Sequence, residues 1–301
     1  MIADSQSGLR SHQAALRWQS QAVLLAFLPL IAVWTTLEAG RLWWVRGAAL
    51  WPGALISVAL AVLVFAARAA TPAAALTGAL FAAALWLQTP GLHTALWPLL
   101  ALLVVTFAAT RFGRRGKEAL GLAEARRGRT ASQVAANLGA AVVAGIPLSA
   151  IHVFSPATFG GGAAMAGMIA AMAEATADTV SSELGQVLGG TPRMITSLRR
   201  VPAGTDGAVS LAGTLSGAIA AGLVVGVAFV ALSPFSRTAL SRIEFSGADA
   251  GIALGAGMAG TLLDSLLGAL PERRGWLNND AVNALSTMAA AVLAAWATQW
   301  V

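Results

Sequence analysis

Nine separate apolar stretches, each close to the length of a membrane-spanning helix, constrain this chain more than any other feature of its sequence. A transmembrane helix needs about 20 mostly apolar residues to cross a hydrocarbon layer of about 30 Å, and its backbone must be satisfied internally. The stretches lie at residues 21–38, 50–67, 72–88, 94–110, 133–152, 162–184, 207–232, 249–270 and 280–299. Only 11% of residues are charged, and no segment has the composition of a soluble domain. We therefore predict an all-α polytopic transmembrane helix bundle of about nine spans, located in the cell (inner) membrane.

The basic residues predict which loops face the cytoplasm. RFGRRGKEALGLAEARRGRT, between the fourth and fifth stretches, is the most basic segment. If it is cytoplasmic, fifteen of the 19 Lys and Arg residues lie inside, and only Arg41, Arg46, Arg237 and Arg242 lie outside. The positive-inside rule then places the N-terminus in the cytoplasm and the C-terminus outside. We assign the positive charge to topology and expect no nucleic-acid partner. We also expect no cleaved signal peptide, since no small-residue cleavage site follows the first apolar stretch.

Polar residues inside the apolar stretches divide the chain into two parts. They are rare in residues 21–110 and recur beside glycine after Arg111. Ionisable groups at membrane depth are costly, so their presence indicates a functional site. We place an N-terminal extension with two transmembrane helices at residues 1–70 and a membrane-embedded domain with a cytoplasmic polar cavity at residues 71–301.

Five stretches carry their polar residues on one face when a rotation of about 100° per residue is applied. The faces contain Arg129, Gln133 and Asn137; Glu174, Asp178, Ser181 and Ser182; Asp206, Ser210 and Thr214; Thr261 and Asp264; and Asn279, Asn283 and Ser286. Glu183 would point away from its neighbours in an unbroken helix, so we expect a bend or a helix end there. The predicted topology places the five faces within about 15 Å of the cytoplasmic surface. They predict one polar cavity that opens to the cytoplasm.

Carboxylates beneath arginines are typical of a site for metal and phosphate. Mg²⁺ prefers one or two carboxylates with phosphate oxygens and water, and guanidinium groups bind phosphate in a bidentate manner. Three interpretations without a metal or phosphate site are also open. The arginines can set topology and bind anionic lipid headgroups, the aspartates can carry protons or pair with arginine, and the glycine stripes can serve packing alone. The sequence contains no Walker A or Rossmann motif.

Five ordered blocks of sequence carry a family resemblance. They are GRTASQVAANLG, AEATADTVSSELGQ, PRMITSLRRVPAGTDGAVSLAGTLSG, GTLLDSLLGA and NNDAVNALST. Over about residues 70–300, the chain resembles the integral membrane family that includes plant phytyl-phosphate kinase of the vitamin E pathway and animal transmembrane protein 19. The resemblance implies that a nucleoside triphosphate, CTP being favoured, phosphorylates an isoprenyl monophosphate to its diphosphate. Asp206 departs from the family pattern because a Ser is expected in that turn, which puts the turn's phosphate role in doubt.

The polar residues and the family resemblance together predict a membrane-embedded kinase with Mg²⁺ as cofactor. We predict that Asp178, Asp264 and Arg129 are catalytic, and that Asp178, Asp264, Glu174 and Glu183 hold the metal. The predicted substrate and nucleotide ligands are Arg111, Lys117, Gln133, Asn137, Ser182, Arg199, Arg200, Gly204, Thr205, Gly207, Ser210, Ser265, Asn279 and Asn283. The predicted partners are a nucleoside triphosphate, an isoprenyl phosphate lipid and membrane lipids. The alternatives are a transporter or flippase of a phosphorylated lipid, and a membrane cytidylyltransferase.

Overall fold

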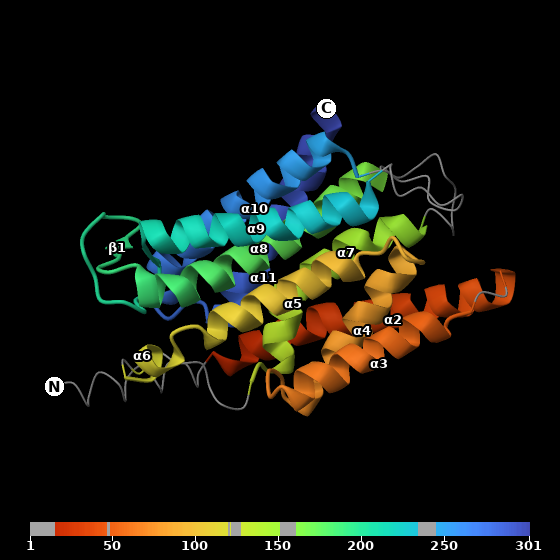
Figure 1. Ribbon diagram of the computed structural model, residues 1–301, viewed down its shortest axis with the longest axis horizontal. Helices are drawn as coiled ribbons and strands as arrows, with labels where there is room; N and C mark the ends of the chain where they lie inside the picture. The colour runs from red at the N-terminus through yellow and green to blue at the C-terminus, as the bar shows by residue number, and fades with distance from the viewer. Residues whose placement is uncertain (1–15, 47–48, 120, 122–127, 151–160, 234–244) are drawn as a thin grey trace.

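The computed structural model describes residues 16–46, 49–119, 121, 128–150, 161–233 and 245–301. Within these residues, each of the nine predicted stretches forms one long helix, and the helices run side by side in a bundle (Figure 1). They are α2 (Arg17–Arg46), α3 (Trp51–Ala66), α4 (Pro72–Gln88), α5 (Leu96–Arg111), α7 (Ala131–Ala150), α8 (Gly161–Leu188), α9 (Leu211–Leu232), α10 (Gly247–Leu267) and α11 (Asn279–Ala297). The short helices are α6 (Arg114–Ala119) and the 3₁₀ turn η3 (Thr298–Trp300).

The prediction of an all-α integral membrane protein is confirmed. Five segments of the described chain are long and apolar enough to cross a membrane: Arg17–Trp44, Ala131–Ala150, Leu211–Leu232, Gly247–Glu272 and Asn279–Trp300. Three shorter apolar helices, α3, α4 and α5, lie beside them. The nine-span count and the cytoplasmic N-terminus stay predictions. Five basic residues used for the topology, Arg10, Arg126, Arg127, Arg237 and Arg242, lie outside the described residues.

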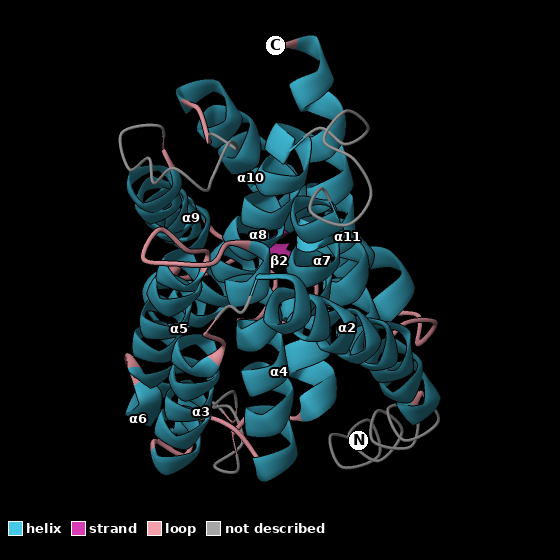
Figure 2. Ribbon diagram, turned by 90° about the vertical axis from the view of Figure 1, so that its right-hand side faces the viewer, coloured by secondary structure: helices cyan, strands magenta, loops and turns pink. Residues whose placement is uncertain are grey.

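Helix α8 is the central helix of the bundle (Figure 2). It packs against α5, α7, α9, α10 and α11. Small residues permit this crowding: a Cβ at Gly217 of α9 would lie 2.7 Å from the Ala177 carbonyl oxygen of α8. The helix is continuous to Leu188, so the bend or helix end expected at Glu183 is wrong. Three carboxylates therefore lie along one unbroken helix that other helices surround.

A small hairpin and a π turn close one end of the bundle. Strand β1 (Arg193–Met194) pairs antiparallel with β2 (Ala208–Val209). Ser210 then caps α9 by accepting a hydrogen bond from Gly213 N at 3.1 Å, so this helix begins later than the predicted residue 207. Helix α10 ends in the π turn η2 (Gly268–Glu272). Gly207 has a positive φ of 73°, and a Cβ there would lie 2.4 Å from Ala269 N. Glycine at this position thus allows the hairpin to dock on the π turn.

The first helix belongs to the same bundle as the later ones. Helix α2 packs against α4, α7 and α11. Gln19, which is buried, accepts a hydrogen bond from Asn278 N and donates one to the Trp276 carbonyl oxygen, both at 2.8 Å. The predicted domain boundary at residue 70 stays a prediction, and these contacts show that α2 reaches the start of α11.

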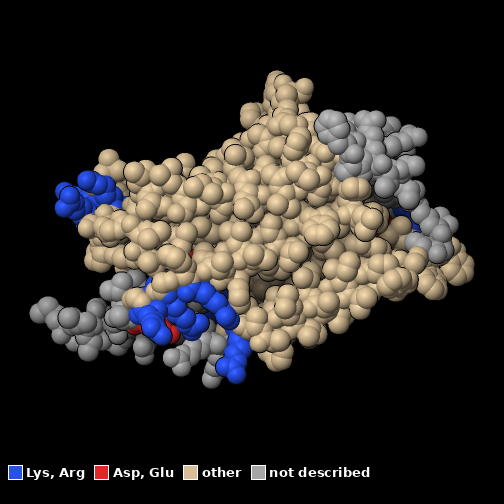
Figure 3. All heavy atoms as spheres, in the orientation of Figure 1, with Lys and Arg blue, Asp and Glu red and all other residues tan. Residues whose placement is uncertain are grey.

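Charge and apolar side chains separate on the surface. Lys and Arg gather over the hairpin and α6 at one end of the molecule, and the long middle of this face shows almost no charge (Figure 3). Large apolar side chains are exposed along the helices, for example Leu25, Val62, Ile219 and Val292. An apolar middle with a basic end is the pattern of a protein surrounded by lipid.

Candidate functional site

A cavity of about 300 Å³ lies at the hairpin end of the bundle. Its walls come from α8, the hairpin turn, the start of α9, the end of α10, η2 and the first residue of α11. Nine of the predicted site residues line it: Asp178, Ser182, Gly204, Thr205, Gly207, Ser210, Asp264, Ser265 and Asn279. Segments more than 100 residues apart therefore meet here, as the stripes of polar residues predicted.

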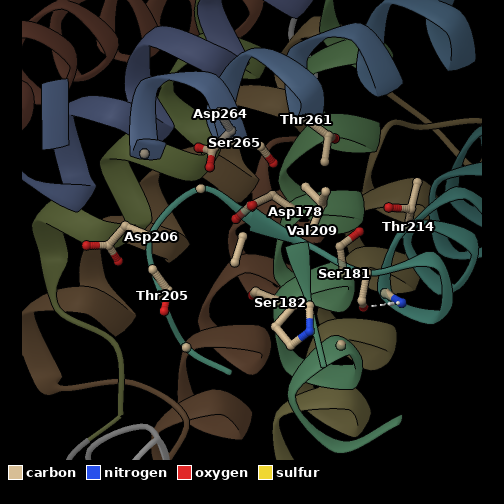
Figure 4. Close-up of a pocket in the computed structure, with 18 of the residues that line it drawn as sticks. Asp178, Ser181, Ser182, Thr205, Asp206, Val209, Thr214, Thr261, Asp264 and Ser265 are labelled. Carbon is tan, nitrogen blue, oxygen red and sulfur yellow. Dashed lines mark hydrogen bonds between the residues drawn. The ribbon is translucent and has the colours of Figure 1, made fainter. Parts of the chain in front are cut away.

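Asp178 of α8 and Asp264 of α10 face each other across the middle of the cavity (Figure 4). The two carboxyl groups lie close enough for each to act electrostatically on the other. Helix α11 supports Asp264 from behind. Ser286 Oγ donates to Asp264 Oδ2 at 3.3 Å, and the Asn283 amide, in the orientation that satisfies its hydrogen bonds, also donates to Oδ2 at 3.3 Å. Asn283 thus acts on Asp264 and does not line the cavity.

Glu174 lies one helical turn deeper on α8 than Asp178. Its side chain is 1% exposed, and it does not line the cavity. Ser286 lies near its carboxyl group, and the carboxyl oxygen Oε1 has no hydrogen-bond partner among the described residues. A buried carboxylate oxygen without a partner is costly, so a proton or a cation is expected there.

Arg129 approaches the carboxylates from the segment before α7. Its backbone is fixed by two hydrogen bonds, Arg129 N to Ala69 O at 2.9 Å and Thr71 N to Arg129 O at 3.0 Å. Its Nη2 donates to Thr179 Oγ1 at 3.3 Å, and its charge acts on Asp178. The structure thus places Arg129 near Asp178, although Arg129 itself does not line the cavity.

The hairpin turn and η2 form the outer end of the cavity. Gly204 and Gly207 both have positive φ angles, 81° and 73°, and Thr205 donates from its hydroxyl to the Pro202 carbonyl oxygen at 2.7 Å. Partial burial raises the pKa of Asp206, and the nearby Arg273 guanidinium opposes the shift. Arg273 also contacts the hairpin through Met194 Sδ at 3.6 Å. The turn therefore presents a carboxylate beside a cation at the outer end of the cavity.

Several predicted ligands have other partners. Lys117, which is 1% exposed, pairs with Glu183 and also donates to the Ala109 and Thr110 carbonyl oxygens at 3.2 and 2.9 Å. Neither member of this ion pair lines the cavity. Lys117 closes the carbonyl end of α5, and Glu183 points away from the cavity, as expected for its position on an unbroken helix.

The remaining predicted ligands lie outside the cavity lining. Arg111 donates to the Ala67 carbonyl oxygen at 2.8 Å and lies over the Phe107 ring. Gln133 caps α7 by accepting from Thr130 N at 2.8 Å, and Asn137 donates to the Gln133 carbonyl oxygen at 2.8 Å. Arg199 and Arg200 are exposed on the hairpin loop beyond the turn. The structure brings none of these five side chains into the cavity lining.

Sequence reasoning missed one carboxylate. Glu272 lines the cavity from the last position of η2, close enough to Asp206 and Asp178 for their charges to act on it. Its segment, LPERRG, follows the eighth stretch and reads as a cytoplasmic loop. A π turn that contains Pro271 returns Glu272 to the cavity. The sequence contains one feature that could have indicated this turn: Pro271 directly precedes Glu272 at the end of the apolar stretch.

The donor set fits a hard cation that shares its coordination with a ligand. Among the described residues, no group of three or more His, Asp or Glu side chains is arranged as a ready metal site. Two carboxylates, Asp178 and Asp264, face the same cavity, and Glu174 has an unsatisfied oxygen behind them. Mg²⁺ commonly takes one or two carboxylates and completes its shell with water and phosphate oxygens. The residues therefore fit Mg²⁺ together with a phosphate ligand.

Comparisons with known proteins agree with this architecture. The family described as integral membrane protein DUF92 matches residues 55–291. An uncharacterized membrane protein of Methanocaldococcus jannaschii is 40% identical over 46% of this chain and 52% of its own length. An uncharacterized membrane protein of Synechocystis is 37% identical over 65% of this chain and 70% of its own length. The chloroplastic protein VTE6 of Arabidopsis thaliana is 32% identical over 64% of this chain and 55% of its own length.

The aligned part covers about half of the Methanocaldococcus protein and of VTE6, so their complete lengths are not represented here. No solved structure matches the chain significantly. The aligned region contains the cavity, because the family match extends from α3 into α11.

Proposed function

We propose, from the premise that this chain belongs to the integral membrane protein DUF92 family, that it is a kinase of isoprenyl monophosphates. The donor is a nucleoside triphosphate, with CTP favoured, and the product is the isoprenyl diphosphate. One observation carries the proposal: two carboxylates from different helices face one cavity at the basic end of a membrane bundle. The resemblance to the phytyl-phosphate kinase family supports it, as does the similarity to VTE6.

The reaction requires little covalent chemistry from the protein. An oxygen of the lipid monophosphate attacks the terminal phosphorus of the nucleotide, a new P–O bond forms, and the bond to the bridging oxygen breaks to release the nucleoside diphosphate. A phosphate monoester is already an anionic nucleophile, so no dedicated base is needed. Positioning and neutralisation of charge are the main tasks of the site.

The chain's own residues divide these tasks. Asp178 and Asp264 would hold Mg²⁺, which when bound neutralises phosphate charge and orients phosphate oxygens. Ser286 and Asn283 keep Asp264 in place from α11. Arg129 contributes a positive charge next to Asp178. The glycine turn at residues 204–207 lets backbone approach a ligand at the outer end, where the exposed Arg199 and Arg200 lie nearby on the same loop.

A product assay tests the proposal. Purified protein in liposomes is incubated with Mg²⁺, with each of labelled CTP, ATP, GTP and UTP, and with isoprenyl monophosphates of different chain lengths. We expect a lipid diphosphate with at least one pair, and CTP to give the highest rate. Transbilayer movement of the lipid phosphate without any diphosphate would contradict the proposal and favour a flippase. Transfer of a cytidylyl group to the lipid would identify a cytidylyltransferase.

A further inference from the structure

The two ends of the cavity differ in chemical character. At the hairpin end, Asp206 and Thr205 make the wall polar, and Asp178 and Asp264 lie in the middle (Figure 4). Away from the hairpin turn lie Thr214 of α9 and Thr261 of α10 (Figure 4), and Met258 and Leu262 of α10 also line the cavity. A ligand that fills the cavity therefore meets carboxylates on one side and, on the other, two threonine side chains together with the apolar Met258 and Leu262.

One apolar residue of the cavity lining also reaches the outer surface of the bundle. Leu262 lines the cavity, and 49% of it is exposed. It therefore lies between the cavity and the outer surface of the bundle. Nearer the opposite membrane face, the two helices are closed against the core. Ala221 and Val225 of α9 and Ala253 of α10 are buried in one apolar cluster.

Helix α9 packs closely on α8 beside the cavity. Gly213 and Gly217 bring α9 into backbone contact with α8: a Cβ at Gly213 would lie 2.6 Å from the Ser181 carbonyl oxygen. At this level α9 contacts α8, and Thr214 of α9 lines the cavity together with Met258 and Leu262 of α10.

We propose that the cavity opens between α9 and α10 at Leu262, and that this opening is a lateral portal for the hydrocarbon chain of a lipid monophosphate. The phosphate lies at Asp178 and Asp264, and the chain leaves between α9 and α10 over Met258 and Leu262 into the bilayer. This inference rests on the proposed function for the identity of the ligand. A lipid that enters sideways never leaves the membrane, so its chain exchanges one apolar environment for another. The portal therefore controls access and tolerates chains of different length.

Photo-crosslinking tests the portal without any need for turnover. The probe is a geranylgeranyl monophosphate with a diazirine on its chain, added to the protein in liposomes without nucleotide. Irradiation should give adducts on the first turn of α9 and on residues 255–266 of α10. Adducts spread evenly over the lipid-facing helices, or concentrated on another helix pair, would overturn the portal.

A matched pair of substitutions sharpens the test. Leu262→Trp fills the opening, and Leu223→Trp adds the same ring to a leucine that is 48% exposed on the opposite face of α9 from Thr214. We expect Leu262→Trp to reduce the adduct yield severalfold and Leu223→Trp to leave it unchanged. Equal yields in both variants would overturn the portal. Adduct mapping on the unsubstituted protein gives the answer even if Leu262→Trp does not fold.

The two proposals can fail separately. Adducts at the portal in a protein that forms no lipid diphosphate would reject the kinase and keep the lateral lipid site. Diphosphate formation with adducts elsewhere would reject the portal and keep the kinase.

Discussion

Asp178 and Asp264 come from helices far apart in sequence and line the same cavity, where their charges interact. If they hold one metal ion, they act as a unit. Asp178→Asn and Asp264→Asn should each lower turnover by orders of magnitude, and the double variant should be little worse than either single one. Steady-state kinetics of all three variants measure this. Losses that multiply in the double variant would show that the two carboxylates act independently.

Lys117 and Glu183 form an ion pair outside the cavity, and this geometry changes what we expect of Glu183. Glu183→Gln leaves the buried Lys117 charge without its counterion, which costs about 3 kcal/mol. The melting temperature should fall, and high Mg²⁺ should not restore activity. Glu118→Gln is the control, because Glu118 pairs with Arg114 at 3.1 Å on the surface, where an ion pair contributes about 0–1 kcal/mol. Rescue of Glu183→Gln by Mg²⁺ would return Glu183 to the metal site.

At the residue scale, helical periodicity identified the cavity wherever a polar stripe faced the bundle centre. Asp178, Asp264 and Asn279 are in this group. The same reasoning placed Gln133 and Asn137 in the site, although the first caps its own helix and the second bonds back to the preceding turn. Periodicity specifies a face of a helix, and it does not distinguish a ligand from a residue that satisfies its own backbone.

Helix α2 contacts the segment directly before α11 through two hydrogen bonds of Gln19. Asn278, which Gln19 contacts, caps α11 by accepting from Ala281 N at 2.9 Å, directly before the cavity residue Asn279. Gln19→Ala should loosen this turn, because it removes two partly buried hydrogen bonds, each of which contributes about 1 kcal/mol. Amide hydrogen exchange of the first turn of α11 should accelerate, and the KM for lipid phosphate or nucleotide should rise.

Gln21→Ala is the matched control for this prediction. Gln21 lies on the same helix only two residues further on, and its side chain is exposed. Exchange in α11 should be unchanged in this variant. Identical exchange in Gln19→Ala and in the unsubstituted protein would show that α2 does not hold the turn.

At the scale of elements, the lengths of the apolar stretches predicted every long helix of the described chain. An apolar segment in a membrane forms a helix because a helix satisfies the backbone hydrogen bonds internally. Helix ends were less predictable. Helix α2, for example, continues past the predicted end at residue 38 and includes Gly40 and Arg41. The hairpin at residues 193–209 was not expected, since two-residue strands carry no periodic signal. Loops that return to the bundle, such as η2, depend on tertiary contacts that sequence periodicity does not contain.

For the whole molecule, the basic end of the bundle defines the predicted cytoplasmic face (Figure 3). The chain has no native cysteine, so single cysteines report their own side of the membrane. Cysteines at Gly121, Gly190 and Gly275 should react with an impermeant maleimide only from the cytoplasmic side, and one at Gly247 only from the other side. Reversed labelling at Gly121 and Gly247 would show that the topology is inverted. The cavity would then face away from the cytoplasm and its nucleotides, which would contradict the proposed function.

The central claim is that the cavity between α8 and α10 transfers a phosphoryl group to a lipid monophosphate. The most direct measurement compares diphosphate formation by the unsubstituted protein and by Asp178→Asn in liposomes, with the melting temperature of each determined in parallel. Asn keeps the shape of the side chain and removes its charge. We predict that the unsubstituted protein forms isoprenyl diphosphate and that Asp178→Asn, at an unchanged melting temperature, loses this activity by orders of magnitude. Full diphosphate formation by a folded Asp178→Asn protein would contradict the account.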